Sequence, residues 1–189
     1  MRKSKNQIAT IALSSFIDDE NLIDKSAKYF KEFGFELLNY SDINERFQRY
    51  SATDKLRLSY LNQAVNNSNV ELIISLRGGY GISRLLPHID FAKLAKSKKL
   101  FIGHSDFTAL QLGLFAQTGA ISFSGPMIYN DFSNEKLSKF TLDSFWDCLK
   151  KSSLDLNIAS LGNPLIELEG VLWGGNLSII NHLIGTPWL

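Results

Sequence analysis

A serine hydroxyl lies where a predicted strand ends and a predicted helix begins. Residues 100–102 form an apolar, β-prone run, and residues 108–118 repeat apolar side chains at helical spacing. Gly103 and Ser105 lie in the turn between them, and Gly103 has no Cβ to obstruct a sharp turn. A strained strand-to-helix turn of this kind, a nucleophile elbow, presents a serine hydroxyl for attack on a carbonyl carbon.

The same turn also fits a purely structural role. The usual elbow pattern is G-x-S-x-G, whereas Phe107 occupies the last position here. Ser and Asp are preferred N-cap residues, so Ser105 or Asp106 could simply cap the helix that follows. The unpaired N–H groups and positive dipole end of that helix would also suit an oxyanion. These residues alone therefore leave both interpretations open.

A glycine-rich loop follows the most apolar predicted strand, residues 70–76. Its sequence is Arg77-Gly78-Gly79-Tyr80-Gly81. Closely spaced glycines let the backbone approach a ligand with its N–H groups exposed, although neither common phosphate-binding glycine motif is present. Ligand sites of open α/β sheets lie at the carboxyl ends of strands. An N–H group of this loop could therefore serve a reaction centred on the predicted elbow.

Alternating strands and helices predict an α/β fold, a mostly parallel sheet flanked by helices. The predicted strands span residues 8–13, 35–38, 70–76, 100–102 and 120–123, with a half-exposed strand at 165–173. The predicted helices span residues 21–33, 53–66, 90–95, 108–118, 134–151 and 177–184.

The composition is that of an ordinary soluble globular protein. Its 189 residues are 44% apolar and 21% charged, and no apolar stretch approaches a membrane span. A net charge of +1 gives no electrostatic footprint for nucleic acid or an anionic membrane, so neither is an expected partner. The single cysteine, Cys148, excludes an internal disulfide and fits a reducing compartment, and its apolar neighbours predict a core position.

Four sequence blocks, taken in order, resemble the LD-carboxypeptidase family of serine peptidases over nearly the whole chain. They are Arg77–Gly81 with Arg84–Pro87, Ile102–Leu110, Gly125–Met127, and Glu169–Gly170 with Gly174–Ser178 and Gly185–Pro187. The resemblance implies a cytoplasmic, cofactor-free and metal-free enzyme of cell-wall recycling that removes the terminal D-amino acid from murein tetrapeptides. A sister branch cleaves the amide of a peptidyl-nucleotide antibiotic. That immunity-type activity and a non-catalytic binding role stay open as alternatives.

The resemblance also implies roles for particular residues. Ser105 matches the nucleophile, and the backbone N–H groups of Gly79 and Asp106 match the oxyanion hole. Each such donor is worth roughly 3–4 kcal/mol of barrier. The same loop would contact the substrate through Gly78, Tyr80 and Arg77.

The catalytic Glu and His of the family are expected beyond Leu189, so we expect little peptidase activity from the chain alone. His104 stands where the family usually has Tyr, but neighbouring residues of an extended turn point in opposite directions, so it is not the expected base. His88 and His182 are expected to be packing or surface residues.

The resemblance implies a two-domain protein, and a polar, turn-rich stretch predicts a linker over 151–164 between a nucleophile domain over residues 1–150 and the start of a second domain over 165–189. Without the rest of that domain, the last part should expose a set of large apolar side chains, so we expect association into a homo-oligomer or disorder at this end. These are Trp173, Ile179, Ile180, Leu183, Ile184 and Trp188.

Overall fold

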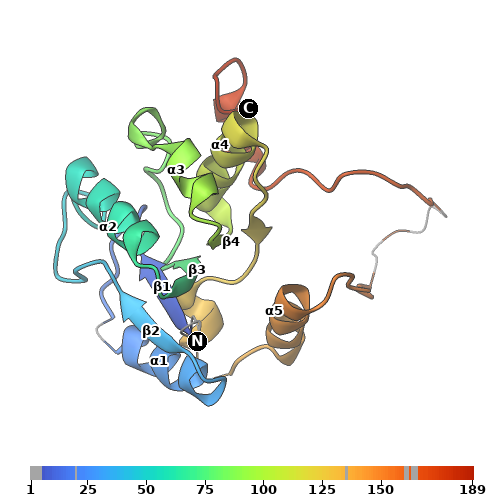
Figure 1. Ribbon diagram of the computed structural model, residues 1–189, viewed down its shortest axis with the longest axis horizontal. Coiled ribbons are helices and arrows are strands. Elements are labelled where there is room, and N and C mark those ends of the chain that lie inside the picture. Colours follow the sequence, from blue (N-terminus) through green and yellow to red (C-terminus); the bar gives the residue numbers. More distant parts are fainter. Residues whose placement is uncertain (1–5, 20, 135, 160–161, 163–165) are drawn as a thin grey trace.

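The computed structural model describes residues 6–19, 21–134, 136–159, 162 and 166–189, and within them a five-stranded parallel sheet forms the centre (Figure 1). The strand order is β2-β1-β3-β4-β5. The strands are β1 (Gln7–Ile11), β2 (Glu36–Asn39), β3 (Val70–Ser75), β4 (Leu100–Gly103) and β5 (Phe123–Ser124). The predicted α/β fold with a parallel sheet is therefore confirmed.

Helices cover both faces of the sheet, because the central strands are apolar on both sides. The helices are α1 (Leu22–Glu32), α2 (Asp54–Asn66), α3 (Phe91–Lys96), α4 (Thr108–Thr118), α5 (Lys139–Lys150) and α6 (Leu177–Leu183). Three short helical turns, η1 (Leu86–His88), η2 (Ser105–Phe107) and η3 (Ile128–Phe132), lie in the described connections. One core joins the sheet to α2, α3, α4 and α6, and the other joins it to α1, η3 and α5.

The second core is largely aromatic. The rings of Phe30 and Phe132 have centroids 4.7 Å apart, and Phe145 packs edge-on against both Phe132 and Trp146. The indole N–H of Trp146 donates a hydrogen bond of 2.8 Å to the hydroxyl of Tyr29, so the polar edge of the ring is satisfied. These contacts attach α5 to the same face as α1.

The strand order determines where a ligand can bind. In this order β1 and β3 are neighbours, and the chain proceeds from them toward opposite edges of the sheet. In open α/β sheets the loops that follow two such strands diverge, and a ligand-binding crevice forms between them at this topological switch point. Residues 12–18, the glycine-rich loop and the turn after β4 all follow carboxyl ends of strands at this one edge.

Three predicted elements differ from the structure. β5 covers only Phe123–Ser124, and α5 begins at Lys139 rather than at residue 134. The strand predicted over 165–173 is wrong for the described residues 166–173, which form no regular element. The side chains of Leu168 and Leu172 are 89% and 100% exposed there, because no neighbouring strand pairs with them in the described structure.

The expected exposure of the C-terminal apolar residues is wrong for most of the set. Ile179 and Leu183 are buried and pack on the core that contains α4, and Ile180 and Trp188 lie half-buried against it. Gly175 brings the backbone against Thr108, whose hydroxyl accepts a hydrogen bond of 3.0 Å from the N–H of Asn176. The terminal segment thus docks on α4.

Some expectations about this end remain predictions. Trp173 and Ile184 are 50% and 65% exposed as expected, but association into a homo-oligomer and the three domain boundaries are untested. The predicted linker over 151–164 lies partly outside the described residues. None of the helices in the described structure has the length and apolar character needed to cross a bilayer.

Cys148 is exposed, so its predicted core position is wrong. It follows Trp146 by two positions, which turns it toward the opposite side of α5. There it lines a cavity of about 390 Å³ between α5 and the carboxyl ends of β4 and β5.

Docking of α6 on α4 gives a stability prediction. Leu183→Ala removes a side chain that is 1% exposed, so the free energy of unfolding in urea should fall by about 2–4 kcal/mol. The matched variant Ile184→Ala, at a side chain 65% exposed, should change it by less than about 0.5 kcal/mol. Equal effects would show that α6 does not pack on the core in solution.

Candidate active site

The turn between β4 and α4 has the geometry of the predicted elbow. Ser105 has a φ of +60°, a left-handed conformation that costs a non-glycine residue energy. A Cβ on Gly103 would lie 2.8 Å from the ring of Phe107 and 2.9 Å from the Cβ of Ser75, so only glycine fits beneath the turn. The helical turn η2 then leads directly into α4.

The alternative that Ser105 or Asp106 caps the helix is wrong. The residues at the N-cap positions of η2 and α4 are His104 and Phe107, and neither makes a side-chain cap hydrogen bond. Within the described residues the Ser105 hydroxyl makes no hydrogen bond, and Asp106 bonds to other loops instead. The strained conformation of Ser105 is therefore not explained by helix capping.

The glycine-rich loop lies directly against Ser105. A Cβ on Gly78 would be 2.9 Å from the Cβ and 3.0 Å from the Oγ of Ser105. Gly79 has a φ of +130°, and a Cβ there would be 2.1 Å from the Oγ of Ser15 in the loop after β1. The structure thus places Gly78 against the candidate nucleophile, as the strand-end argument predicted for this loop, and Gly79 against the loop after β1.

The other two predicted substrate-contacting side chains lie at the margin of this junction. Tyr80 is 43% exposed. Arg77 is half-buried, and its Nη1 donates a hydrogen bond of 2.9 Å to the carbonyl oxygen of Phe16 while its guanidinium lies 5.0 Å from the ring centroid of Tyr129. No contact of either side chain with Ser105 is present in the described structure.

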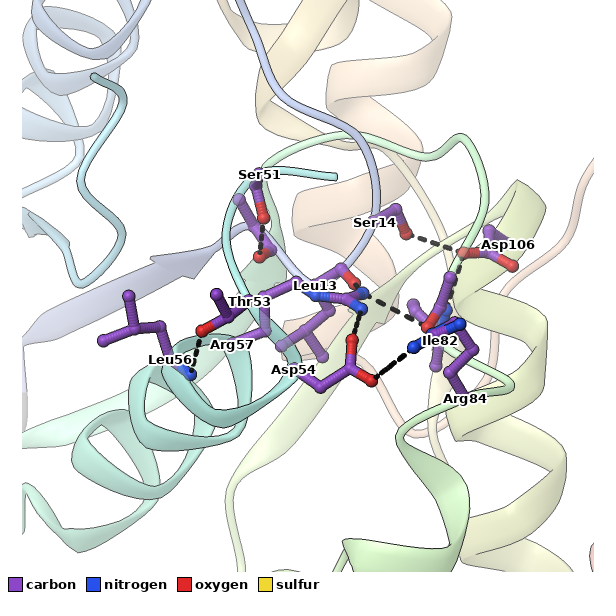
Figure 2. A network of polar contacts seen from close by, with 12 residues as sticks. Leu13, Ser14, Ser51, Thr53, Asp54, Leu56, Arg57, Ile82, Arg84 and Asp106 are labelled. Carbon is purple, nitrogen blue, oxygen red and sulfur yellow. Dashed lines mark hydrogen bonds and ion pairs between the residues drawn. The ribbon is translucent and has the colours of Figure 1, made fainter. Parts of the chain in front are cut away.

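The side chain of Asp106 connects the elbow to both neighbouring loops (Figure 2). Its Oδ2 accepts hydrogen bonds of 2.8 Å from the Ser14 hydroxyl and 3.1 Å from the N–H of Ile82. Burial raises the pKa of Asp106, and these two hydrogen bonds oppose that rise. Its Oδ1 is buried without a hydrogen-bond partner among the described residues. Sequence reasoning assigned this residue a backbone N–H in the oxyanion hole or a helix cap, and did not predict the contacts of its side chain with the two neighbouring loops.

A buried arginine holds the same two loops from the other side (Figure 2). Arg57 of α2 donates hydrogen bonds to the carbonyl oxygens of Leu13 and Gly81, the latter at 3.1 Å. Its ion pair with Asp54 measures 2.6 Å, and Arg84 binds the second oxygen of that carboxylate at 2.9 Å. Burial lowers the pKa of Arg57, while the hydrogen bond from Arg84 and then that from Arg57 lower the pKa of Asp54.

His104 points away from Ser105, as predicted. Its Nε2 lies 3.5 Å from the Oδ2 of Asp131, which also accepts a 2.8 Å hydrogen bond from the N–H of Met127. Burial raises the pKa of Asp131, but the hydrogen bonds from His104 and Met127 outweigh it and leave that pKa below its usual value. His88 and His182 are exposed, and no histidine of the described residues makes a hydrogen bond to Ser105, although the charge of His182 acts on the neighbouring Asp106 and lowers its pKa slightly against the effect of burial.

The described part of the chain contains no group of three or more His, Cys, Asp or Glu side chains that could bind a metal ion. The groups that the structure does place at this edge are a strained serine hydroxyl, the glycine-rich loop and nearby arginines.

Comparison with known proteins agrees with this arrangement. A family model described as the LD-carboxypeptidase N-terminal domain matches residues 8–125. The chain therefore belongs to the LD-carboxypeptidase family.

One solved structure and one sequence relative are named as carboxypeptidases of murein peptides. The crystal structure of a muramoyltetrapeptide carboxypeptidase from Oxalobacter formigenes is 44% identical, with a TM-score of 0.88 over 97% of this chain and 61% of that one. A probable murein peptide carboxypeptidase of Bacillus subtilis is 27% identical over 90% of this chain and 54% of its own length.

The microcin C7 self-immunity protein MccF of Escherichia coli is also similar, 27% identical over 90% of this chain and 58% of its own length. A structure of MccF with aspartyl sulfamoyl adenosine is 25% identical, with a TM-score of 0.84 over 99% of this chain and 65% of that one. The chain thus spans between 54% and 65% of the length of each of these four matches.

The Asp54 pairs predict how stability depends on pH. Because the pKa of Asp54 is lowered by folding, its charge stabilises the fold above its unfolded pKa of about 3.9 and stops doing so as the pH falls through the folded pKa. In urea unfolding at pH 7, the free energy of unfolding of Asp54→Asn should be about 1–2 kcal/mol lower than that of the wild type, a figure reduced because Asp54 is partly exposed. This deficit should shrink below about pH 4.

A control for this prediction is Asp155→Asn, at an exposed residue with no ion pair in the described structure. Its free energy of unfolding should equal that of the wild type at every pH. A deficit for Asp54→Asn that persisted unchanged at pH 2 would show that lost packing, and not the charge, caused it.

Proposed function

We propose that this chain is the nucleophile-bearing part of a serine-type carboxypeptidase that removes the terminal D-amino acid from murein tetrapeptides in cytoplasmic cell-wall recycling. The observation that carries the proposal is the strained Ser105, φ +60°, packed against Gly78 of the glycine-rich loop. A strained residue at a ligand-binding sheet edge is typical of a site whose geometry serves catalysis.

The proposed reaction begins when the Ser105 Oγ attacks the carbonyl carbon of the L,D bond. The carbonyl oxygen becomes an oxyanion, which accepts hydrogen bonds from the N–H groups of Gly79 and Asp106. Collapse of the tetrahedral intermediate breaks the C–N bond, the D-amino acid leaves with a proton on its amine, and water then hydrolyses the ester on Ser105.

The proton transfers need a base that the described residues do not bring to Ser105. We expect a Glu and a His from the part of the family's proteins that this chain does not span. The protein of 189 residues should therefore show little activity alone, because loss of the base costs orders of magnitude in rate.

Murein peptide is the favoured substrate because the relative of that activity is the more similar one, at 44% against 25% identity for MccF. An aminoacyl-nucleotide conjugate is the second candidate, supported by the similarity to MccF. A non-catalytic binding role is the third, and the following experiments distinguish it from both.

One prediction of the proposed function concerns the chain alone. Incubation with a murein tetrapeptide should release D-alanine no faster than about a thousandth of the rate of a complete family member. Chromatographic detection of free D-alanine measures this. Release at ordinary enzyme rates would show that the described residues already contain a complete catalytic site.

Another prediction of the proposed function uses a chimera, in which this chain is joined to the part of the Oxalobacter enzyme that this chain does not cover. This chimera should release D-alanine, and Ser105→Ala should reduce its kcat by about 10⁴-fold or more. Ser124→Ala, a serine substitution on the neighbouring strand, should leave the kcat of the chimera within about twofold of its original value. A folded chimera whose activity survived Ser105→Ala would refute the nucleophile assignment, and one that cleaved only aminoacyl-nucleotide conjugates would favour the second candidate.

A further inference from the structure

A short hairpin carrying two arginines lies over the candidate active site. The N–H of Phe47 donates to the carbonyl of Tyr50 at 3.1 Å, and the N–H of Tyr50 donates back to the carbonyl of Phe47 at 2.9 Å. Gln48, with a φ of +58°, makes the turn between them. Arg46 and Arg49 are exposed on this hairpin.

The hairpin is fixed to both loops that form the site. The ring of Tyr50 is buried against Gly81, where an added Cβ would lie 2.7 Å away. Tyr50 also bridges to Ser15, and the N–H of Ser51 donates to the carbonyl of Ser14 at 3.0 Å. Because of these contacts, Arg49 is presented from a backbone that is held in one position.

Three guanidinium groups contact the residues that follow Gly79 and Ser15 in the chain. Arg49 lies 5.9 Å from the ring centroid of Tyr80, the residue after Gly79. Arg46 lies 3.6 Å from the ring centroid of Phe16, the residue after Ser15, and Arg77 donates to the carbonyl of that same Phe16. We name Arg46, Arg49 and Arg77 the arginine rim.

The arginine rim lacks negative partners in the described structure. Arg57 and Arg84 share the carboxylate of Asp54, whereas no ion pair of the described residues includes an arginine of the rim. The Nε of Arg77 is buried without a hydrogen-bond partner there. Three like charges without a carboxylate partner repel one another. Arg46 and Arg77 each donate one hydrogen bond to a backbone carbonyl, of Gln48 and Phe16, and a guanidinium has five N–H donors, so donors remain that can bind a carboxylate.

We infer that the arginine rim binds the terminal carboxylate of the peptide substrate, with Arg46 and Arg49 as its specificity-determining residues. The inference rests on the proposed function. In a carboxypeptidase the terminal carboxylate lies one residue, about 3.5 Å of extended chain, beyond the carbonyl under attack. If that carbonyl oxygen binds at Gly79, the carboxylate falls beside Ser15 and within reach of the rim.

The test is a comparison of binding by the 189-residue protein without turnover. Isothermal titration calorimetry measures the Kd of a murein tetrapeptide with a free terminal carboxylate and of the same peptide with a terminal carboxamide. The wild type should prefer the free acid by roughly tenfold. Arg46→Gln and Arg49→Gln should each reduce this preference severalfold, and the double variant should abolish it.

Two further variants make the comparison specific. Lys55→Gln removes one positive charge from an exposed position on α2 and should leave the preference unchanged. Arg49→Lys keeps the charge but not the bidentate fork, so its preference should lie between those of the wild type and Arg49→Gln.

Retention of the wild-type preference by the double variant would overturn the inference. An equal affinity of the wild type for both peptides, or no binding of either, would also overturn it. The proposed function is tested separately by the Ser105-dependent release of D-alanine, so its failure can be told apart. A preference that followed another carboxylate of the peptide, seen when that carboxylate is amidated and the terminal one is left free, would refute the assignment to the terminal carboxylate.

Discussion

The buried carboxylate of Asp106 is the interaction on which the candidate site depends. It lies one residue after Ser105 and accepts hydrogen bonds from Ser14, at the end of β1, and from Ile82, after the glycine-rich loop. One side chain therefore connects the three loops that follow β1, β3 and β4. Burial of a carboxylate is costly, as its raised pKa shows, and this cost is consistent with a positional role for the group.

Arg57 complements Asp106. Asp106 accepts hydrogen bonds from the loops, whereas Arg57 donates hydrogen bonds to their backbone carbonyl oxygens. Its guanidinium joins Leu13 to Gly81, and Asp54 balances its charge. The backbone between these two anchors is thereby confined on both sides. Such confinement offsets the cost of holding Ser105 in a left-handed conformation, whereas Gly79 adopts its positive φ without strain. The hairpin that carries Arg46 and Arg49 is attached to the same anchors, because its Tyr50 packs on Gly81 and on the guanidinium of Arg57.

Local patterns in the sequence predicted the sheet and the elbow, because Gly103 and the apolar runs beside it carry their signals within a few residues. The glycine-rich loop was found for the same reason. The role of the Asp106 side chain was not predicted, because Ser14 lies 92 residues away and no local pattern encodes that contact. Arg57 was missed because an arginine in a helix ordinarily lies in solvent. The strand over 165–173 was predicted wrongly because alternation shows suitability for pairing without showing that a partner strand exists.

The central claim is that the Asp106 carboxylate holds the glycine-rich loop against the elbow. Hydrogen exchange of the Ile82 amide, followed by NMR, tests it most directly because that N–H is itself the donor. In a folded Asp106→Ala variant, the account predicts exchange at Ile82 roughly 10- to 100-fold faster relative to amides of β3 than in the wild type. Unchanged relative exchange at Ile82 would contradict the account.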